Sequence, residues 1–269
     1  MVFPYRVLIT GASGYIGRHL TKHLAGKGVR VRGLSRYPQP DQPDCREWFR
    51  GDVTRPVDVQ QAIEGCDVVI HLACLPLADC LKNPGEAFAV NATGTFNILQ
   101  AAHDANNVPV VYTTTAQAYS RENKLPLRED DRTQPHTPYA ASKLCGELAC
   151  QTFAKHWGLP VSILRLFNVY GPAVNGKTRP TVETLFLKRA LENRPPLIKG
   201  NPEEGRDFIH IDDVVVAIEL AVSKMPAGKV INIGSGTLTT LQMLARTIID
   251  LVGADLEPDV EPNGQLPYQ

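Results

Sequence analysis

The stretch Thr10-Gly-Ala-Ser-Gly-Tyr-Ile-Gly17 decides the fold of this chain. It follows the β-branched run that begins at Arg6, and it opens an amphipathic segment that continues to Lys27. Glycines at positions 11, 14 and 17 permit a tight turn, close approach of the backbone to a pyrophosphate and close packing of the next helix. A helix that begins here presents unpaired N–H groups to phosphate oxygens. Strand, glycine turn and helix in this order predict a dinucleotide-binding site.

Outward from this turn, short apolar strands alternate with longer amphipathic segments. The predicted strands are 6–10, 29–34, 67–73, 109–115 and 161–166, and the predicted helices are 15–27, 57–64, 86–106 and 139–157. Apolar strands joined by helical crossovers indicate a parallel sheet covered on both faces. The predicted fold class is α/β, a Rossmann-type doubly wound parallel sheet with a smaller discontinuous C-terminal substrate lobe.

The pattern changes after Gly171-Pro172, where a loop rich in Asn, Gly, Lys and Pro precedes a predicted helix over 182–192. Strand-like sequence returns at 230–234, and a last helix is predicted over 239–252. We therefore expect a dinucleotide-binding domain made of residues 1–170 and 206–234. Residues 171–205 and 235–269 would form the substrate-binding lobe.

The composition argues against nucleic acid and membranes as partners. The 269 residues contain 28 Lys+Arg and 28 Asp+Glu, so no basic field indicates nucleic acid or an anionic membrane. The apolar runs are far shorter than the roughly 20 residues that span a bilayer, and no signal peptide is apparent, so we expect a cytoplasmic protein. The six cysteines form no Cys-x-x-Cys pair, which favours reduced thiols and no metal site.

The second predicted strand ends at Gly33-Leu-Ser-Arg-Tyr37, which carries no carboxylate to hold the ribose 2′-hydroxyl of NAD. Ser35 can donate to a 2′-phosphate, and Arg36 can pair with it and stack on adenine. This chemistry favours NADP over NAD as the cofactor. The alternative is that Arg36 is a solvated loop cation.

A candidate catalytic pair lies at the start of the helix predicted over 139–157. Tyr139 and Lys143 are four residues apart, hence on one helix face. The pKa of a free tyrosine is near ~10, but an adjacent ammonium and a cationic nicotinamide ring favour its phenolate. Tyr139 can then take a hydroxyl proton while hydride leaves the same carbon. Thr115, at the end of a preceding strand, can supply a third hydroxyl group.

These features together resemble the extended short-chain dehydrogenase/reductases, the NAD(P)-dependent nucleotide-sugar epimerase/dehydratase family. The resemblance runs from about Arg6 to Leu251. Beyond TGASGYIG it includes, in order, GDVT at 51–54, DVVIHLA at 67–73, VNATGTFNIL at 90–99, VVYTTTAQAYS at 110–120, PYAASK at 138–143, LRLFNVYGP at 164–172, RDFIHIDDV at 206–214 and INIGSG at 231–236.

The resemblance implies a role for each matching residue. Tyr139 would be the acid/base, Lys143 its activator and ribose ligand, and Thr115 the hydroxyl that holds the sugar oxygen. Asn168 and Arg206 would contact the substrate diphosphate, unless Arg206 forms a salt bridge with Asp207 or a neighbouring acid. The cofactor contacts would be Gly11, Ser13, Gly14, Tyr15, Ile16, Gly17, Ser35, Arg36, Asp52, Val53, Leu72 and Ala73, together with Tyr139 and Lys143, with Asp52 at the adenine.

Three further expectations concern residues near these motifs. Asn91 is expected to order its helix rather than touch ligand, and Tyr119 to pack or to form a wall of the substrate site. Cys74 and Cys145 are expected to be small buried packing thiols. The resemblance also implies a homodimer through the helices at 86–106 and 139–157, and a chain that is short at its C-terminus relative to the family.

The chain departs from the family's 4,6-dehydratases directly after Thr115. Those enzymes carry an Asp-Glu pair there, whereas this chain has Ala116-Gln117, neither of which exchanges a proton. This favours a 4-epimerase-like reaction on a nucleotide-diphosphate sugar. The alternatives are a nucleotide-sugar dehydratase, an NADPH-dependent carbonyl reductase, and a non-enzymatic dinucleotide-binding redox sensor, although such sensors commonly lose the Tyr-Lys pair.

Overall fold

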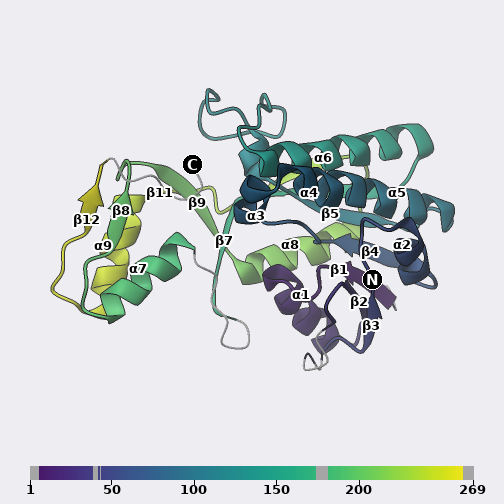
Figure 1. Cartoon of the computed structure of the whole chain (residues 1–269), viewed down its shortest axis with the longest axis horizontal. Helices are drawn as coiled ribbons and strands as arrows, with labels where there is room; N and C mark the ends of the chain where they lie inside the picture. Colours follow the sequence, from purple (N-terminus) through teal and green to yellow (C-terminus); the bar gives the residue numbers. More distant parts are fainter. Residues whose placement is uncertain (1–5, 39–41, 43, 174–180, 263–269) are drawn as a thin grey trace. The chain divides into compact units, whose positions relative to one another are not determined.

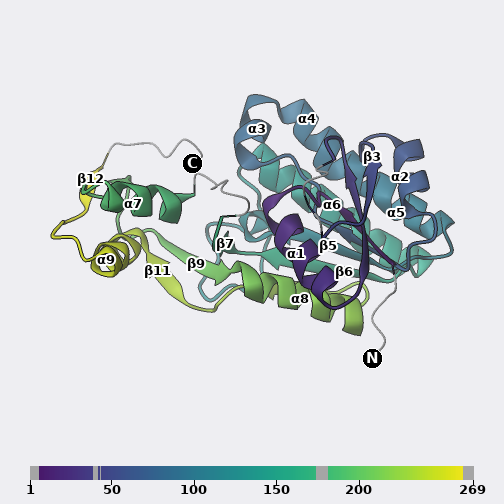
Figure 2. The same cartoon turned by 90° about the horizontal axis from the view of Figure 1, so that it is seen from below.

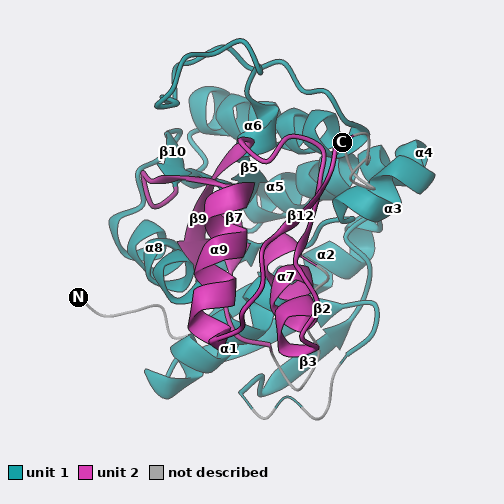
Figure 3. Cartoon of the chain, turned by 90° about the vertical axis from the view of Figure 1, so that its left-hand side faces the viewer, with its two compact units in different colours: residues 1–167, 211–233 teal, residues 168–210, 234–269 magenta. Residues whose placement is uncertain are grey.

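The computed structural model describes residues 6–38, 42, 44–173 and 181–262. The chain divides into two units, each made of two segments (Figure 3). The first unit contains residues 1–167 and 211–233, and the second contains residues 168–210 and 234–269. The sequence placed the boundaries at 170, 206 and 234, and the division of cofactor and substrate binding between the units stays a prediction.

Seven parallel strands form the sheet of the first unit, in the order β10-β6-β5-β4-β1-β2-β3. Figure 1 labels β5, β4, β1, β2 and β3 of this sheet. Their bounds are β1 Arg6–Thr10, β2 Arg30–Ser35, β3 Glu47–Arg50, β4 Val68–His71, β5 Val110–Thr115, β6 Val161–Leu166 and β10 Val230–Ile233. Every residue of β4, β5 and β6 is buried, as expected for central strands covered on both faces. The order reverses beside β1, where a doubly wound sheet binds ligands. The predicted fold class is confirmed.

Helices cover both faces of this sheet. They are α1 Tyr15–Gly26, α2 Pro56–Ile63, α3 Leu77–Lys82, α4 Pro84–Phe88, α5 Gly94–Asp104, α6 Pro138–Trp157 and α8 Ile211–Lys224, with a π-helical turn η1 Ala89–Thr93 and a 3₁₀ turn η2 Ala116–Ala118. Helices α1 and α8 pack together on one face, and α2, α5 and α6 follow one another across the other (Figure 2). The helix predicted over 86–106 is therefore three successive segments, α4, η1 and α5. No helix among the described residues is both long and apolar enough to cross a membrane.

The second unit has its own small core. Strand β9 Gly205–His210 pairs with β7 Asn168–Tyr170 in parallel and with β11 Leu238–Thr240 in antiparallel, while β8 Leu197–Lys199 pairs with β12 Asp259–Glu261. Helices α7 Val182–Leu191 and α9 Leu241–Val252 pack on each other. The core residues are Phe186, Ala190, Ile198, Leu241, Ala245 and Ile248. The loop at Ala173 to Pro180 lies outside the described residues, except for Ala173.

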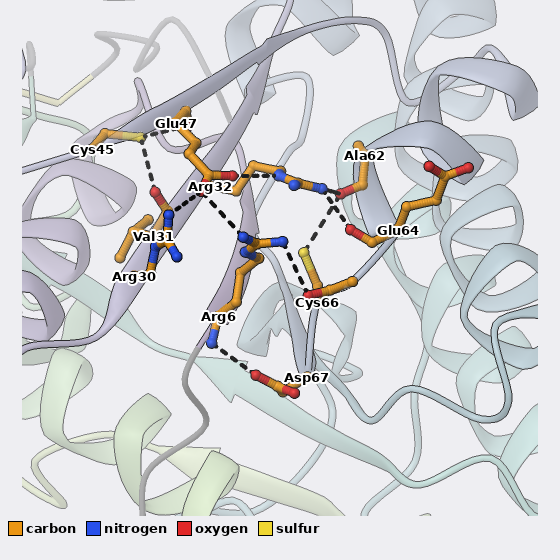
Figure 4. A network of polar contacts seen from close by, with 11 residues as sticks. Arg6, Arg30, Val31, Arg32, Cys45, Glu47, Ala62, Glu64, Cys66 and Asp67 are labelled. Atoms are coloured by element: carbon orange, nitrogen blue, oxygen red, sulfur yellow. Dashed lines mark hydrogen bonds and ion pairs between the residues drawn. The ribbon is translucent and has the colours of Figure 1, made fainter.

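A charged network ties together the amino ends of the strands at the β3 edge of the sheet (Figure 4). Arg30 Nη2 and Arg32 Nε donate to the two carboxylate oxygens of Glu47, at 3.3 and 3.0 Å. Arg32 Nη1 also donates to the carbonyl oxygens of Ala62 and Glu64, at 2.8 and 2.9 Å. Because the strands are parallel, this network lies at their amino ends, whereas the glycine-rich turn lies at their carboxyl ends. The network links β2, β3 and the end of α2, and the candidate site lies at the opposite, carboxyl ends of the strands.

Candidate active site

The turn between β1 and α1 has the geometry of a phosphate-binding loop. Gly11 has φ +70°, and a Cβ built on it would lie 2.8 Å from the backbone nitrogen of Ala73. Helix α1 begins after Gly14 with no side-chain cap and no acidic residue in its first turn. The N–H groups of that turn are thus aimed out of the helix end with nothing acidic beside them, which suits a pyrophosphate. Ser13, Tyr15, Ile16 and the buried Gly17 lie in this turn or in the first turn of α1.

The residues predicted at the adenine and ribose follow the next strands along the same edge. Ser35 ends β2; its Oγ lies 3.1 Å from Ser13 Oγ and accepts from the backbone N–H of Tyr37 at 3.1 Å. The Arg36 guanidinium lies 3.8 Å from a carboxylate oxygen of Glu86 and 5.9 Å from the centroid of the Tyr37 ring, and the Arg36 side chain is about half exposed. Arg36 is therefore only loosely engaged, as a group that accepts an anionic ligand would need to be.

Two further predicted cofactor segments lie after β3 and β4. Asp52 accepts from the N–H and the hydroxyl group of Thr54, both at 2.9 Å, and the next residue, Val53, is buried. Leu72 and Ala73 follow β4, and the Ala73 N–H donates to Thr10 Oγ1 at 3.1 Å. The structure thus aligns all predicted cofactor contacts except Tyr139 and Lys143, which lie on α6, with the carboxyl ends of β1 to β4, where these parallel strands present their loops.

The candidate catalytic residues lie at the adjoining ends of β5 and α6. Thr137 caps α6 by accepting from the Ala140 N–H at 3.1 Å, and Pro138 occupies the first helical position. This start places the half-buried Tyr139 and the buried Lys143 one turn apart on one face. Thr115 is the last residue of β5, and the turn η2 that follows it packs against α6.

Thr115 and Lys143 are each held by neighbouring groups. The Gln117 N–H donates to Thr115 Oγ1 at 3.2 Å, which orients that hydroxyl group. Burial lowers the pKa of Lys143, and its ammonium lies 4.3 Å from the centroid of the Tyr112 ring. Such a ring face attracts a desolvated cation. The arrangement offers one phenol, one ammonium and one hydroxyl group for proton transfer at a bound alcohol.

Asn168 and Arg206 belong to the second unit, on β7 and β9. Asn168 Nδ2 donates to the carbonyl oxygen of Asp207 at 3.0 Å. Arg206 donates through Nε and Nη2 to one carboxylate oxygen of Glu204, at 3.0 and 2.7 Å. The salt bridge with a neighbouring acid, expected as an alternative, is therefore formed with Glu204, while Asp207 caps the backbone of Ser235 and Gly236. Contact of Asn168 and Arg206 with a diphosphate stays a prediction.

A family model described as "NAD dependent epimerase/dehydratase family" matches residues 7–234, which include the glycine turn, Thr115, Tyr139 and Lys143. The chain belongs to this family. It is an NAD-dependent epimerase/dehydratase family enzyme with a dinucleotide-binding sheet, as the resemblance of its motifs implied.

Relatives in the family catalyse more than one reaction. The UDP-N-acetyl-alpha-D-glucosaminuronate decarboxylase of Bacillus cytotoxicus is 31% identical over 258 residues, which cover 91% of this chain and 80% of the relative. The structure of the UDP-glucose 4-epimerase of Thermotoga maritima with UDP-glucose matches with a TM-score of 0.88 at 25% identity, covering 98% of this chain and 87% of that one. The Thermus thermophilus UDP-glucose 4-epimerase in complex with NAD matches with a TM-score of 0.83 at 26% identity, covering 98% and 88%.

One expectation about the cysteines of this family member is wrong. Cys74 and Cys145 are exposed, whereas Cys45, Cys66, Cys80 and Cys150 are buried. Cys145 comes two residues after Lys143 on α6, so it points away from the face that Lys143 buries. Cys74 lies in the loop after β4. Among the described residues, no group of three His, Cys, Asp or Glu could hold a metal ion.

Asn91 does more than order its own helical turn. Its Oδ1 accepts from the Leu75 N–H at 2.7 Å, and its Nδ2 donates to Ser142 Oγ at 3.0 Å. Ser142 in turn donates to the carbonyl oxygen of Tyr139 at 2.9 Å. Asn91 therefore links the loop after β4 to the end of α6 that carries Tyr139. The motif VNATGTFNIL drew attention to Asn91, but the sequence could not predict its contacts with Leu75 and Ser142.

Proposed function

We propose that this enzyme is a nucleotide-sugar 4-epimerase, with Tyr139 as the acid/base, Lys143 as its activator and Thr115 as the hydroxyl group that holds the reacting oxygen. The observation that carries the proposal is the pair Ala116-Gln117 directly after Thr115. A methyl group and a carboxamide cannot give or take a proton at C5 or C6, so elimination of water lacks an acid/base pair there. The same Tyr139 can remove and return the single proton that epimerisation requires.

The chain's residues divide the reaction as follows. The glycine turn and the open end of α1 hold the dinucleotide, and the bound nicotinamide supplies a reversible hydride acceptor. Thr115 holds the C4 oxygen, and the Tyr139 phenolate takes its proton as the alcohol becomes a ketone. After the keto-sugar presents its other face, Tyr139 returns the proton to the same oxygen. Lys143 keeps Tyr139 in the phenolate form by its charge.

We expect the substrate to be a UDP-sugar, because the relative from Thermotoga maritima was solved with UDP-glucose. The test is incubation of the purified protein with NAD or NADP and a panel of UDP-sugars, with products resolved by chromatography and mass. A product of unchanged mass and new retention is expected. Loss of water or of carbon dioxide would instead indicate dehydration or decarboxylation, and would refute the proposal.

The variant Tyr139→Phe tests whether turnover depends on the Tyr139 hydroxyl group. It removes only the phenolic oxygen, so turnover should fall by at least ~100-fold, the usual contribution of a general acid/base. Dinucleotide affinity, measured by quenching of intrinsic fluorescence, should stay near that of the wild type, since the change removes one hydroxyl group and leaves the pyrophosphate-binding turn intact. Substantial residual turnover would show that another group moves the proton.

We also propose that NADP binds more tightly than NAD. Support comes from Ser35 and Arg36 at the end of β2, since the segment 33–37 carries no carboxylate to repel a 2′-phosphate. The exposed Arg36 pair with Glu86 at 3.8 Å holds the guanidinium weakly. Arg36→Ala should weaken NADP binding by about ten-fold and leave NAD binding nearly unchanged. Equal loss for both dinucleotides would contradict this role.

A homodimer is proposed through α5 and α6. Both helices carry large apolar side chains that are exposed in the single chain, namely Phe96 at 47%, Leu148 at 53% and Trp157 at 44%. Burial of such side chains against a second copy would remove them from water. Light scattering should report twice the monomer mass, and Leu148→Glu should return the mass to that of a monomer. A wild-type protein that is monomeric at high concentration would contradict the proposal.

A further inference from the structure

Tyr112 contacts Lys143 through its hydroxyl group and through its ring. The side chain is fully buried in β5, three residues before Thr115. Its hydroxyl group donates to the backbone carbonyl oxygen of Lys143 at 3.0 Å, and its ring centroid lies 4.3 Å from Lys143 Nζ. One side chain thus fixes both the helix backbone at residue 143 and the ammonium at its tip.

His71 lies against the same ring. It is the register partner of Tyr112 on the neighbouring strand β4, and the two rings stack with centroids 5.6 Å apart and planes at 25°. Thr10 Oγ1, which accepts from the Ala73 N–H, lies 2.7 Å from His71 Nδ1. Thr95 Oγ1, which donates to the Asn91 carbonyl oxygen, lies 3.0 Å from His71 Nε2.

These partners select one state of the imidazole. Thr10 can donate its hydroxyl proton to Nδ1 and Thr95 can accept from Nε2, a pattern that suits a neutral ring with its proton on Nε2. Burial and the nearby Lys143 charge lower the pKa of His71 to about 3. A neutral ring adds no positive charge beside the Lys143 ammonium.

Gly146 sets the approach of α6 to Tyr112. A Cβ at this position would lie 2.5 Å from the Tyr112 hydroxyl oxygen and 3.0 Å from the Asn91 carbonyl oxygen. Any larger residue would therefore push the helix or the hydroxyl group away. The hydrogen bond from Tyr112 to the Lys143 carbonyl oxygen depends on this close contact.

The other groups that face Lys143 do not replace the ring. Burial raises the pKa of the Cys80 thiol to about 11 and raises that of Cys150, so both are neutral near pH 7. Glu147 is already bonded to Arg165 at 2.5 and 3.1 Å. The titratable groups around Lys143 are His71 on β4, Tyr112 on β5, Cys74 and Cys80 after β4, and Tyr139, Glu147 and Cys150 on α6.

We propose that Tyr112 is a positioning residue for the catalytic pair: its ring holds the Lys143 ammonium in the charged form, its hydroxyl group holds the helix at Lys143, and the neutral His71 supports the ring. The inference rests on the proposed function in so far as Tyr139 and Lys143 are the catalytic pair. Strand β5 would then contribute two residues to the site, Thr115 and, three residues earlier, Tyr112.

The test follows the ionisation of Tyr139 by its tyrosinate absorbance, in the protein without substrate. The band that disappears in Tyr139→Phe belongs to Tyr139; Tyr112 does not interfere, since burial raises its pKa well above the ordinary value. Tyr112→Leu removes the ring face, so Lys143 loses its charge more readily and the Tyr139 midpoint should rise by about one pH unit, equal to about 1.4 kcal/mol. Tyr112→Phe keeps the ring and loses only the hydroxyl contact with the Lys143 carbonyl oxygen, so it should raise the midpoint by about half a unit.

Phe153→Leu is the matched control, because Phe153 is a buried aromatic residue of α6 in the same core cluster. It should leave the Tyr139 midpoint unchanged. A folded Tyr112→Leu protein with the wild-type midpoint would overturn the proposal, as would an equal shift in Phe153→Leu. If Tyr112→Leu does not fold, Gly146→Ala displaces the hydroxyl contact and should raise the midpoint by about half a unit; an unchanged midpoint there also overturns the proposal.

This experiment separates the inference from the proposed function. The titration needs no substrate, so a shift in Tyr112→Leu supports the positioning role even if no UDP-sugar is epimerised. Conversely, the wild type could epimerise a UDP-sugar while the Tyr139 midpoint is unshifted in Tyr112→Leu. That result would support the proposed function and refute the positioning role of Tyr112.

Discussion

Loss of the Glu147 charge should strongly destabilise the first unit. Glu147 on α6 and Arg165 on β6 form a pair of hydrogen bonds at 2.5 and 3.1 Å, and the two side chains are only 1% and 4% exposed. Arg165 Nη1 also donates to the Glu129 carbonyl oxygen at 3.0 Å. In Glu147→Gln the guanidinium stays buried without its counter-charge.

The magnitude follows from burial of the remaining charge. Removal of one partner from a buried ion pair costs about 3–5 kcal/mol, whereas replacement of both by apolar groups is often nearly neutral. For a unit of this size, each kcal/mol corresponds to about 2–4 °C in Tm. We therefore expect Glu147→Gln to lower Tm by about 6–20 °C, and the double variant Glu147→Leu with Arg165→Met to recover most of that loss.

Thermal unfolding followed by tryptophan fluorescence measures the Tm of the first unit, and denaturant unfolding measures its free energy. The chain has two tryptophans, Trp48 and Trp157, and both belong to the first unit. Glu122→Gln is the matched control, because its pair with Arg132 is 3.5 Å long and largely exposed, so it should cost less than about 1 kcal/mol. If Glu147→Gln were no more destabilising than Glu122→Gln, the buried pair would not hold α6 to the sheet.

Three further predictions address the site. Buried His71 has a pKa of about 3, whereas an unfolded histidine titrates near ~6.5, so its contribution to stability is complete above pH 6.5 and is lost as the pH falls. The free energy of unfolding should therefore fall by about 2 kcal/mol between pH 7 and pH 5. His71→Gln should flatten this dependence on pH, measured by denaturant titration at each pH. Gly11→Ala, whose Cβ would lie 2.8 Å from the Ala73 nitrogen, should weaken dinucleotide binding at least ~10-fold by fluorescence titration, and unaltered affinity would contradict the fit of the turn. Of the six thiols, Cys74 and Cys145 should react rapidly with a thiol reagent in the native protein and the other four only on unfolding, and rapid reaction of all six would contradict their burial.

The central strands could be predicted from sequence because burial on both faces leaves a continuous apolar run. Strand β6 has the predicted bounds, Val161–Leu166, and β1 has the predicted bounds, Arg6–Thr10. Strand β3 escaped prediction because Glu47-Trp-Phe-Arg50 is four residues long, lies at the sheet edge and has charged ends. The three-residue strands of the second unit, such as the exposed β12, carry too little pattern to be seen.

Residues in the candidate site differ in how far sequence could place them. Tyr139, Lys143 and Thr115 are marked by spacing and by strand ends. The contact of Tyr112 with Lys143 depends on the height of α6 above β5, and the stack with His71 depends on strand register, neither of which sequence supplies. The burial expected for Cys145 was wrong because nearness to a motif says nothing of the direction in which a side chain points.

Similarity alone does not decide which reaction this family member catalyses. A decarboxylase at 31% identity and 4-epimerase structures at 25% and 26% are matched over comparable shares of the chain. These names share a nucleotide-linked sugar, so the sheet and the dinucleotide turn do not separate the reactions. Decarboxylation needs a sugar that carries a carboxylate beside the carbon to be oxidised. For a sugar without one, epimerisation and dehydration differ in which proton donors surround the sugar after hydride removal. With Ala116 and Gln117 after Thr115, the proposed role of Tyr139 is to take and return one proton. The reaction we propose therefore begins and ends at the same carbon, with its configuration inverted.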